Sequence, residues 1–158
     1  MFHLEIQNEC AAALPDPAWL VDCAQLAYQG ELQGSAVLRI VGPDEARTLN
    51  HEFRDKDYAT NILSFPSDFS DLPEGVLDDE EAGYLGDLVV CADIIADEAK
   101  QQSKSVAHHW AHLVVHGILH LQGYDHIEED EAALMESLEI KLLGKIGVPD
   151  PYNETEAS

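Results

Sequence analysis

Three histidines in the C-terminal half of the chain have the spacing of a metal site. His116 and His120 are four residues apart, so one turn of a helix would bring both imidazoles to the same face. Imidazole nitrogens are common zinc ligands, and a helix holds two of them rigidly. Gly123 can reverse the chain after this helix and return His126 as a third ligand. The spacing predicts one zinc ion (Zn2+) per chain, bound by His116, His120 and His126.

The number of ligands indicates a catalytic rather than a structural zinc site. Three neutral nitrogens leave the fourth position of a tetrahedral site open for water. The same H-x-x-x-H-x-x-G-x-x-H spacing occurs in metzincin proteases, which add a glutamate as general base directly after the first histidine. That position is Gly117 in this chain. The sequence therefore supports metal binding and argues against peptide hydrolysis.

Three more histidines, His108, His109 and His112, precede the predicted ligands. The pairs 108/112 and 112/116 share the one-turn spacing, but no turn places a third ligand beside them. A single histidine on a helix is more often hydrogen-bonded or at the surface than bound to a metal. We therefore predict that these three histidines are hydrogen-bonded or surface residues rather than ligands.

The predicted secondary structure alternates strands and helices. Apolar or alternating segments predict strands at 2–7, 35–41, 62–65 and 84–91. Helices are predicted at 15–29, 43–53, 93–102 and 103–122, with a last helix that starts near a capping box at Asp125 and ends before Gly147. In the helix at 103–122, the ligand histidines lie opposite an apolar stripe that should face the core. The stripe consists of Val106, Trp110, Leu113, Val114, Ile118 and Leu121.

Length and composition indicate one globular domain. A chain of 158 residues with 46% hydrophobic residues can bury a core, so we expect a single catalytic domain at 1–148 and a disordered tail at 149–158. Cys10, Cys23 and Cys91 lack C-x-x-C pairing and are expected to be buried small hydrophobic residues. The first residues lack a signal-peptide pattern, and no segment approaches the ~20 apolar residues of a membrane span. We expect a cytoplasmic protein that does not contact a membrane.

The formal net charge of −23 is unevenly distributed. Residues 57–98 contain twelve acidic residues and no Lys or Arg, whereas residues 39–56 contain half of all Lys and Arg. This distribution is compatible with a local cationic cleft for nucleic acid, and equally with an acidic excess that only keeps the protein soluble. The long acidic segment between Phe65 and Tyr84 fits either a flap over a site or a disordered loop.

Two segments resemble a known family. Residues 116–126, HGILHLQGYDH, resemble the H-G-x-L-H-L-x-G-Y-D-H signature of the YbeY endoribonucleases, bacterial zinc proteins of ribosomal RNA maturation. Residues 49–65, LNHEFRDKDYATNILSF, are similar to the family segment L-N-x-x-x-R-x-K-D-x-x-T-N-V-L-S-F, with Ile62 in place of valine. Length and element order agree as well, so the resemblance covers nearly the whole chain. The acidic loop and the tail carry no signature.

The resemblance implies an α+β fold. It consists of a mixed four-stranded sheet flanked by about five helices, with the zinc site at the end of the long histidine-bearing helix and Arg54 facing the zinc. A guanidinium there could donate hydrogen bonds to two anionic oxygens of a phosphodiester transition state. Without the resemblance, Arg54 would be interpreted as a surface cation paired with a neighbouring acid. Lys56 could bind phosphate or be a solvated lysine, and Asp125 could orient a histidine, although helix capping is the favoured role.

The function that the resemblance implies is metal-dependent cleavage of single-stranded RNA. The expected role is maturation of small-subunit ribosomal RNA and ribosome quality control. Expected partners are ribosomal RNA, the small ribosomal subunit and ribosome-associated proteins. Two alternatives are a non-catalytic ribosome-assembly factor with structural zinc and a divergent metallopeptidase. Water at the fourth zinc position would favour the enzyme, whereas a fourth protein ligand would favour the assembly factor.

Overall fold

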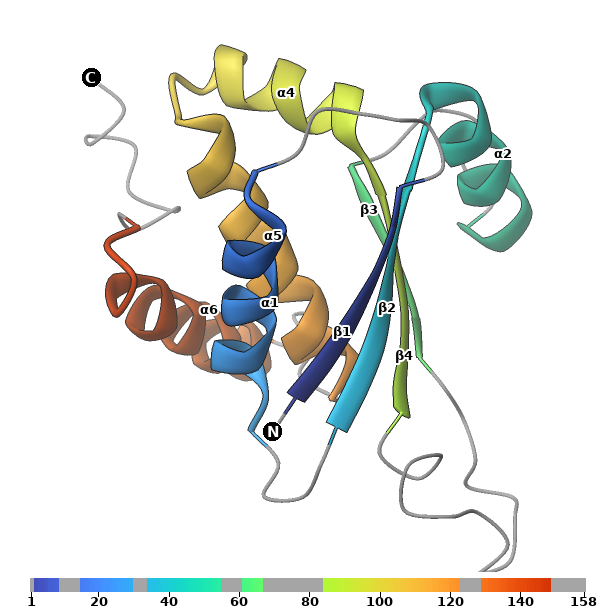
Figure 1. Cartoon of the computed structure of the whole chain (residues 1–158). Coiled ribbons are helices and arrows are strands. Elements are labelled where there is room, and N and C mark those ends of the chain that lie inside the picture. Colours follow the sequence, from blue (N-terminus) through green and yellow to red (C-terminus); the bar gives the residue numbers. More distant parts are fainter. Residues whose placement is uncertain are drawn as a thin grey trace, which may run out of the picture.

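The fold was analysed in a computed structural model, which describes residues 2–8, 15–29, 34–54, 61–66, 84–122 and 129–148. Strands and helices follow the predicted order, and together they form the α+β architecture predicted from the resemblance (Figure 1). The elements are β1 (Phe2–Asn8), α1 (Pro17–Ala27), β2 (Gly34–Val41), α2 (Pro43–Arg54), β3 (Ile62–Pro66), β4 (Tyr84–Cys91), α4 (Ala92–Gln101), α5 (Val106–Leu121) and α6 (Glu129–Gly144).

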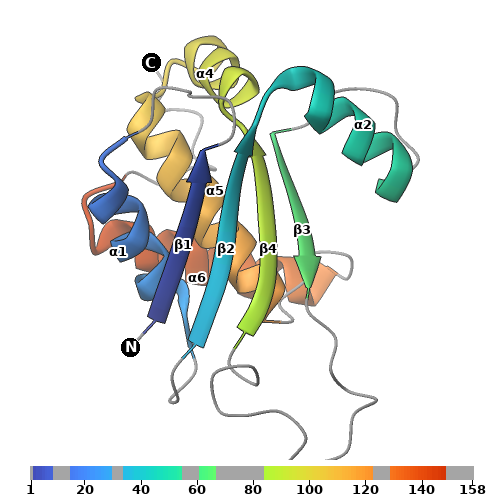
Figure 2. The ribbon, with the colours of Figure 1, turned by 45° about the vertical axis from the view of Figure 1, so that its right-hand side comes forward.

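The four strands form one mixed sheet in the order β1-β2-β4-β3 (Figure 2). β2 is parallel to both of its neighbours, β1 and β4, whereas β3 forms an antiparallel edge on β4. In the register, Leu38 lies opposite Leu88, and Leu63 lies opposite Val89. This arrangement confirms the mixed four-stranded sheet implied by the resemblance.

The two faces of the sheet have different coverings. Because successive side chains of a strand point to opposite faces, Leu38 and Leu88 belong to the main core with α1 and α5, whereas Val41 and Val89 belong to a second cluster with Ala46 of α2. Figure 1 shows α2 on one side of the sheet and α1, α5 and α6 on the other. The histidine-bearing helix therefore lies in the thicker layer of the fold.

Helix α5 is the central helix of this layer, because its side chains are buried on most sides. The predicted core positions are confirmed except Val106, which is 45% exposed. Val106 is the first residue of the helix and follows the exposed Ser105, so it has little neighbouring structure to pack against. Buried residues of α5 are Trp110, Ala111, Leu113, Val114, Val115, Ile118, Leu119 and Leu121.

Helix α5 begins three residues later than the sequence pattern predicted. Ser103 has a φ of 55°, a left-handed conformation that a continuous α-helix does not allow. Ser105 then caps the new helix, since its hydroxyl accepts a 3.4 Å hydrogen bond from the backbone N–H of His108. With 16 residues, α5 is among the longest described helices, and none of the described helices is long and apolar enough to cross a membrane.

Two of the three cysteines are buried small residues, as expected. Cys23 and Cys91 are fully buried, and Cys10 lies outside the described residues. Burial raises the pKa of the Cys23 thiol to about 12. The thiol is therefore protonated at neutral pH and behaves as a small apolar side chain.

Candidate metal centre

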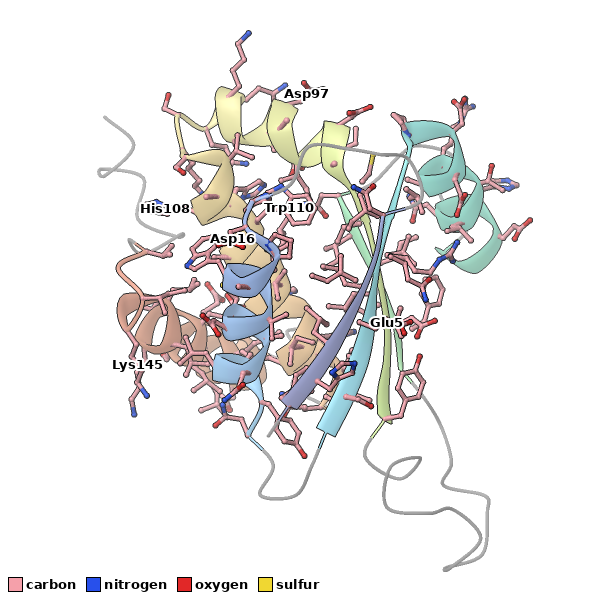
Figure 3. The ribbon with its side chains drawn as sticks, viewed as in Figure 1. Glu5, Asp16, Asp97, His108, Trp110 and Lys145 are labelled. Atoms are coloured by element: carbon pink, nitrogen blue, oxygen red, sulfur yellow. The ribbon has the colours of Figure 1, made fainter. Side chains whose placement is uncertain are left out.

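The histidines of α5 form a row along one side of the helix. The ring centroids of His109 and His112 are 6.4 Å apart, and those of His112 and His116 are 6.1 Å apart. His120 follows one turn later, in the last turn of α5. By contrast, His108 lies on the outer side of the first turn (Figure 3). His109, His112 and His116 therefore lie on one side of this helix.

Helix α6 brings a buried carboxylate to this row. Glu139 is fully buried, and its Oε1 lies 2.5 Å from Nδ1 of His116. Its Oε2 lies 3.3 Å from Nε2 of His112. A carboxylate in an apolar interior requires hydrogen-bond partners to offset the loss of hydration. The two imidazoles meet this requirement and connect α6 to α5.

His112, His116 and Glu139 form a group that could hold a metal ion, since one ligand atom from each lies within 4.8 Å of the others. The distances within the group distinguish two ligands of one metal from two groups joined by a hydrogen bond. Two ligands of one tetrahedral zinc lie about 3.3 to 3.5 Å apart, whereas His116 and Glu139 approach to 2.5 Å. That separation is a hydrogen bond in which Nδ1–H of His116 donates to the carboxylate. This hydrogen bond places the lone pair of a neutral His116 imidazole on Nε2.

Two of the three predicted ligands can be located in the structure. His116 and His120 both belong to the C-terminal half of α5, one turn apart. His126 lies outside the described residues, as do Gly123 and Asp125. The three-histidine site therefore remains a prediction, and the described part of it matches the required arrangement of two imidazoles on one rigid helix.

Gly117 has a packing role that the sequence did not reveal. A Cβ atom added at this position would lie 2.8 Å from Cδ2 of Leu88 and 3.0 Å from Cδ1 of Ile62. Position 117 thus faces the sheet, and α5 approaches β3 and β4 too closely for a long side chain. A glutamate like the general base of the metzincins would not fit here. This geometry supports the prediction that the protein is not a peptidase of that type.

A second carboxylate connects the histidine helix to the segment at 49–65. Oε1 of Glu98, in α4, lies 2.9 Å from Nε2 of His109 and also accepts a 2.9 Å hydrogen bond from Nδ2 of Asn61. Burial lowers the pKa of His109 even though the hydrogen bond to Glu98 opposes this shift. His109 is therefore a buried, hydrogen-bonded histidine. Through Glu98, it is connected to Asn61, the residue before β3 in the second motif.

The predicted cationic residues are only partly located. Arg54 is the last residue of α2, and this helix lies on the face of the sheet opposite to α5 (Figure 1). Its side chain and the whole of Lys56 lie outside the described parts of the chain. Arg39, from the same basic region, forms a 2.9 Å ion pair with Glu45. The roles of Arg54 and Lys56 remain predictions.

Glu98 and Glu139 were both missed at the sequence level. A signal was present for Glu139, because Met135, Leu142 and Leu143 lie at helical spacing on the same stripe and are all buried. A carboxylate within an apolar stripe indicates a buried partner. No corresponding signal was present for Glu98, whose partners are Asn61, just before β3, and His109 of α5.

Comparisons with known proteins identify the family of this chain. A profile of the family described as Endoribonuclease YbeY matches residues 18–147. The Endoribonuclease YbeY of Pseudomonas putida (strain W619) is 49% identical over 157 residues, which cover 99% of this chain and 96% of that protein. The protein of the same name from Alcanivorax borkumensis is 49% identical over 128 residues, covering 80% of this chain and 71% of that protein.

A solved structure supports the fold independently. The solution structure of TM1509 from Thermotoga maritima matches this chain with a TM-score of 0.52 and 21% identity, over 95% of this chain and 99% of that one. At this identity the match concerns the fold alone. The profile match and the near-full-length relatives establish that the chain belongs to the YbeY endoribonuclease family.

Proposed function

We propose that this protein is a zinc-dependent endoribonuclease that cleaves single-stranded RNA during maturation of small-subunit ribosomal RNA and in ribosome quality control. Family membership supports the nuclease activity. One structural observation supports the proposed metal dependence. His116 directs Nδ1 to a buried carboxylate and lies one turn before His120. Two imidazoles one turn apart on a rigid helix, one of them oriented by a carboxylate, are suited to hold a divalent ion.

The proposed reaction depends on a small set of residues. His116, His120 and His126 would hold the ion. When bound, a divalent ion supplies a water with a pKa lowered towards 7 and polarises a phosphoryl oxygen. Because Gly117 leaves no room for a glutamate base, the protein's own contribution would be the geometry of the ligands and the cations that face the substrate.

Arg54 and Lys56 are the proposed cations. The permanently charged guanidinium of Arg54 would bind two anionic oxygens of the phosphodiester and stabilise the charge that develops in the transition state. Lys56 would bind a neighbouring phosphate as a point charge. The support for both is their position in the segment at 49–65, which Asn61 connects to the histidine helix through Glu98.

The proposed partners are ribosomal RNA, the small ribosomal subunit and ribosome-associated proteins in the cytoplasm. In this proposal, residues 1–148 form the catalytic domain and residues 149–158 a disordered tail. Because the chain carries a net charge of −23, contact with RNA would be confined to the cationic regions and sensitive to salt.

The test is cleavage of a ribosomal RNA fragment that contains single-stranded regions. Protein purified without added metal is assayed directly, after removal of metal with a chelator, and after return of one equivalent of zinc. We expect chelation to abolish cleavage and zinc to restore it. His120→Ala should be inactive in all three assays, whereas the matched His108→Ala variant should behave like the parent. Cleavage that persists in His120→Ala would contradict the proposal.

The same assay separates the alternatives. Zinc-loaded protein that binds ribosomal particles but cleaves no RNA, alone or on the particle, would be an assembly factor with structural zinc. Zinc-dependent cleavage of a peptide library without cleavage of RNA would instead identify a metallopeptidase.

A further inference from the structure

We infer that Glu139 is a positioning residue that sets which histidines of α5 bind the metal and with which ring nitrogen. The inference rests on the proposed function, since it concerns the metal that His116, His120 and His126 would hold. The residue lies on α6, outside both motifs that resemble the family. Its assignment comes from its contacts with two histidines and from its complete burial.

The contact with His116 fixes the tautomer and the direction of that ring. A carboxylate only accepts hydrogen bonds, and a neutral imidazole carries a proton on one of its two nitrogens. Since Nδ1 of His116 lies 2.5 Å from Oε1 of Glu139, the proton belongs on Nδ1. The lone pair is then on Nε2, which points to the side of the ring away from Glu139. This is the orientation that metal-binding histidines commonly obtain from a carboxylate.

The contact with His112 has the opposite consequence. Glu139 meets His112 through Nε2, at 3.3 Å, so Nε2 is the nitrogen that donates to the carboxylate. The outer nitrogen of His112 is thus engaged by the carboxylate, and its inner nitrogen, Nδ1, is buried in the protein, which disfavours both as metal ligands. One carboxylate therefore selects between two histidine pairs of identical spacing. It favours 116/120 and disfavours 112/116.

Complete burial makes this constraint strong. Glu139 is 0% exposed and lies among Met135, Leu142 and Leu143 on the inner side of α6. A buried carboxylate cannot exchange a protein partner for bulk water without a large free-energy cost. Its position is also held by the packing of α6 against α5. The orientation of His116 is therefore set before any metal binds.

The pair of Glu98 and His109 provides a matched control. It is also a carboxylate–histidine pair on α5 that connects this helix to another element. His109 lies seven residues before His116, about 10 Å along the helix axis. Removing the charge of Glu98 therefore disturbs a similar interhelical contact without touching the ring of a proposed ligand.

The experiment compares Glu139→Gln with Glu98→Gln. Zinc affinity is measured by competition with a chromophoric chelator, and the thermal stability of the metal-free proteins is measured in parallel. We expect zinc affinity to fall about 10- to 100-fold in Glu139→Gln and to remain at the parental value in Glu98→Gln. The Co2+-substituted forms should differ in the same way, with an altered visible absorption spectrum only for Glu139→Gln. Equal zinc affinities in parent and Glu139→Gln would overturn the inference.

A second measurement does not depend on any variant of Glu139. Long-range 1H–15N NMR spectra of the zinc-loaded parent report which nitrogen of each histidine is protonated. We expect a proton on Nδ1 and metal on Nε2 for His116, and a proton on Nε2 for His112. Metal on Nδ1 of His116 would overturn the inference even if Glu139→Gln failed to fold.

The variants also separate this inference from the proposed function. If His120→Ala retains full zinc affinity while His112→Asn and Glu139→Gln lose it, Glu139 is itself a ligand, and both the inference and the proposed ligand set are wrong. If His120→Ala loses zinc while Glu139→Gln binds it like the parent, the ligand set stands and only the positioning role fails.

Discussion

At the scale of single residues, the histidines of α5 differ in role because they differ in the ring nitrogen that meets a carboxylate. His109 and His112 use Nε2, the outer nitrogen, towards Glu98 and Glu139. His116 uses Nδ1 towards Glu139 and so directs Nε2 away from that carboxylate. The same side chain is therefore structural in two positions and suited to metal binding in the third.

The proposed role of Arg54 leads to a test that separates catalysis from folding. Arg54→Ala should keep the zinc content and melting temperature of the parent, because the residue lies at the end of α2 and outside the histidine motif. Its RNA cleavage rate should fall on the order of a few hundredfold, because the transition state would lose ~3 to 4 kcal/mol of stabilisation. The measurement is the cleavage rate at saturating RNA.

Arg54→Lys provides the control for charge. It should recover only part of the lost rate, since an ammonium keeps the charge but not the two-pronged geometry of a guanidinium. If Arg54→Ala cleaves RNA at the parental rate, Arg54 is not part of the active site. Loss of zinc in that variant would make it a structural residue instead.

Asp87 leads to a prediction about stability and pH. It lies on β4 opposite Phe65, and its Oδ1 is buried without a hydrogen-bond partner among the described residues. Burial raises the pKa of this carboxyl above 3.8, although Arg39 opposes the shift. The folded state therefore binds a proton more readily than the unfolded state, and stability is lost as pH rises through the folded pKa.

Asp87→Asn should consequently be more stable than the parent at neutral pH. The advantage should shrink as pH falls below the folded pKa, where the parental carboxyl is protonated as well. Urea unfolding at a series of pH values measures the difference. A variant that is less stable than the parent at neutral pH would show that the charged carboxylate has a favourable partner.

At the scale of elements, the close contact between α5 and the sheet determines what the histidine motif can contain. A side chain at position 117 would point at Leu88 and Ile62. Gly117→Glu should lower the free energy of unfolding by at least about 3 kcal/mol, because it overfills the contact and buries a carboxylate without a partner. Chemical denaturation of the metal-free protein measures this loss.

Gly117→Ala is the matched control for that substitution. Its Cβ meets only the flexible ends of Leu88 and Ile62, and alanine is better than glycine in a helix by about 1 kcal/mol. The change in unfolding free energy should therefore stay within about 1 kcal/mol. A Gly117→Glu variant as stable as Gly117→Ala would contradict the close packing of α5 on β3 and β4.

The sequence predicted the elements well because each has a local signal. Periodicity identified all described strands and helices, and most boundaries lie within a few residues of the prediction. The start of α5 was wrong because the left-handed Ser103 interrupts a helical pattern. Glu98 and Glu139 were missed because their roles depend on contacts between elements far apart in the sequence. Local spacing predicted the ligands but not the side chains that orient them.

At the scale of the whole molecule, the uneven charge predicts RNA binding that is local and sensitive to salt. The logarithm of affinity for single-stranded RNA should fall linearly with the logarithm of salt concentration, with a slope of about −0.7 for each phosphate contact. Lys56→Ala should reduce the slope by about one such contact. Lys145→Ala, at the residue that follows α6 (Figure 3), should leave the slope unchanged. Affinity that does not change with salt would contradict this electrostatic account.

At this scale, we propose that the molecule holds a single metal through histidines from the end of α5 and from position 126. The most direct test is elemental analysis of protein purified without added metal, for the parent and for His116→Ala, His126→Ala and His108→Ala. We predict one equivalent of zinc in the parent and in His108→Ala, and far less than one equivalent in His116→Ala and His126→Ala. A full equivalent retained by both of the latter variants would show that the metal, and the reaction proposed for it, do not belong to this site.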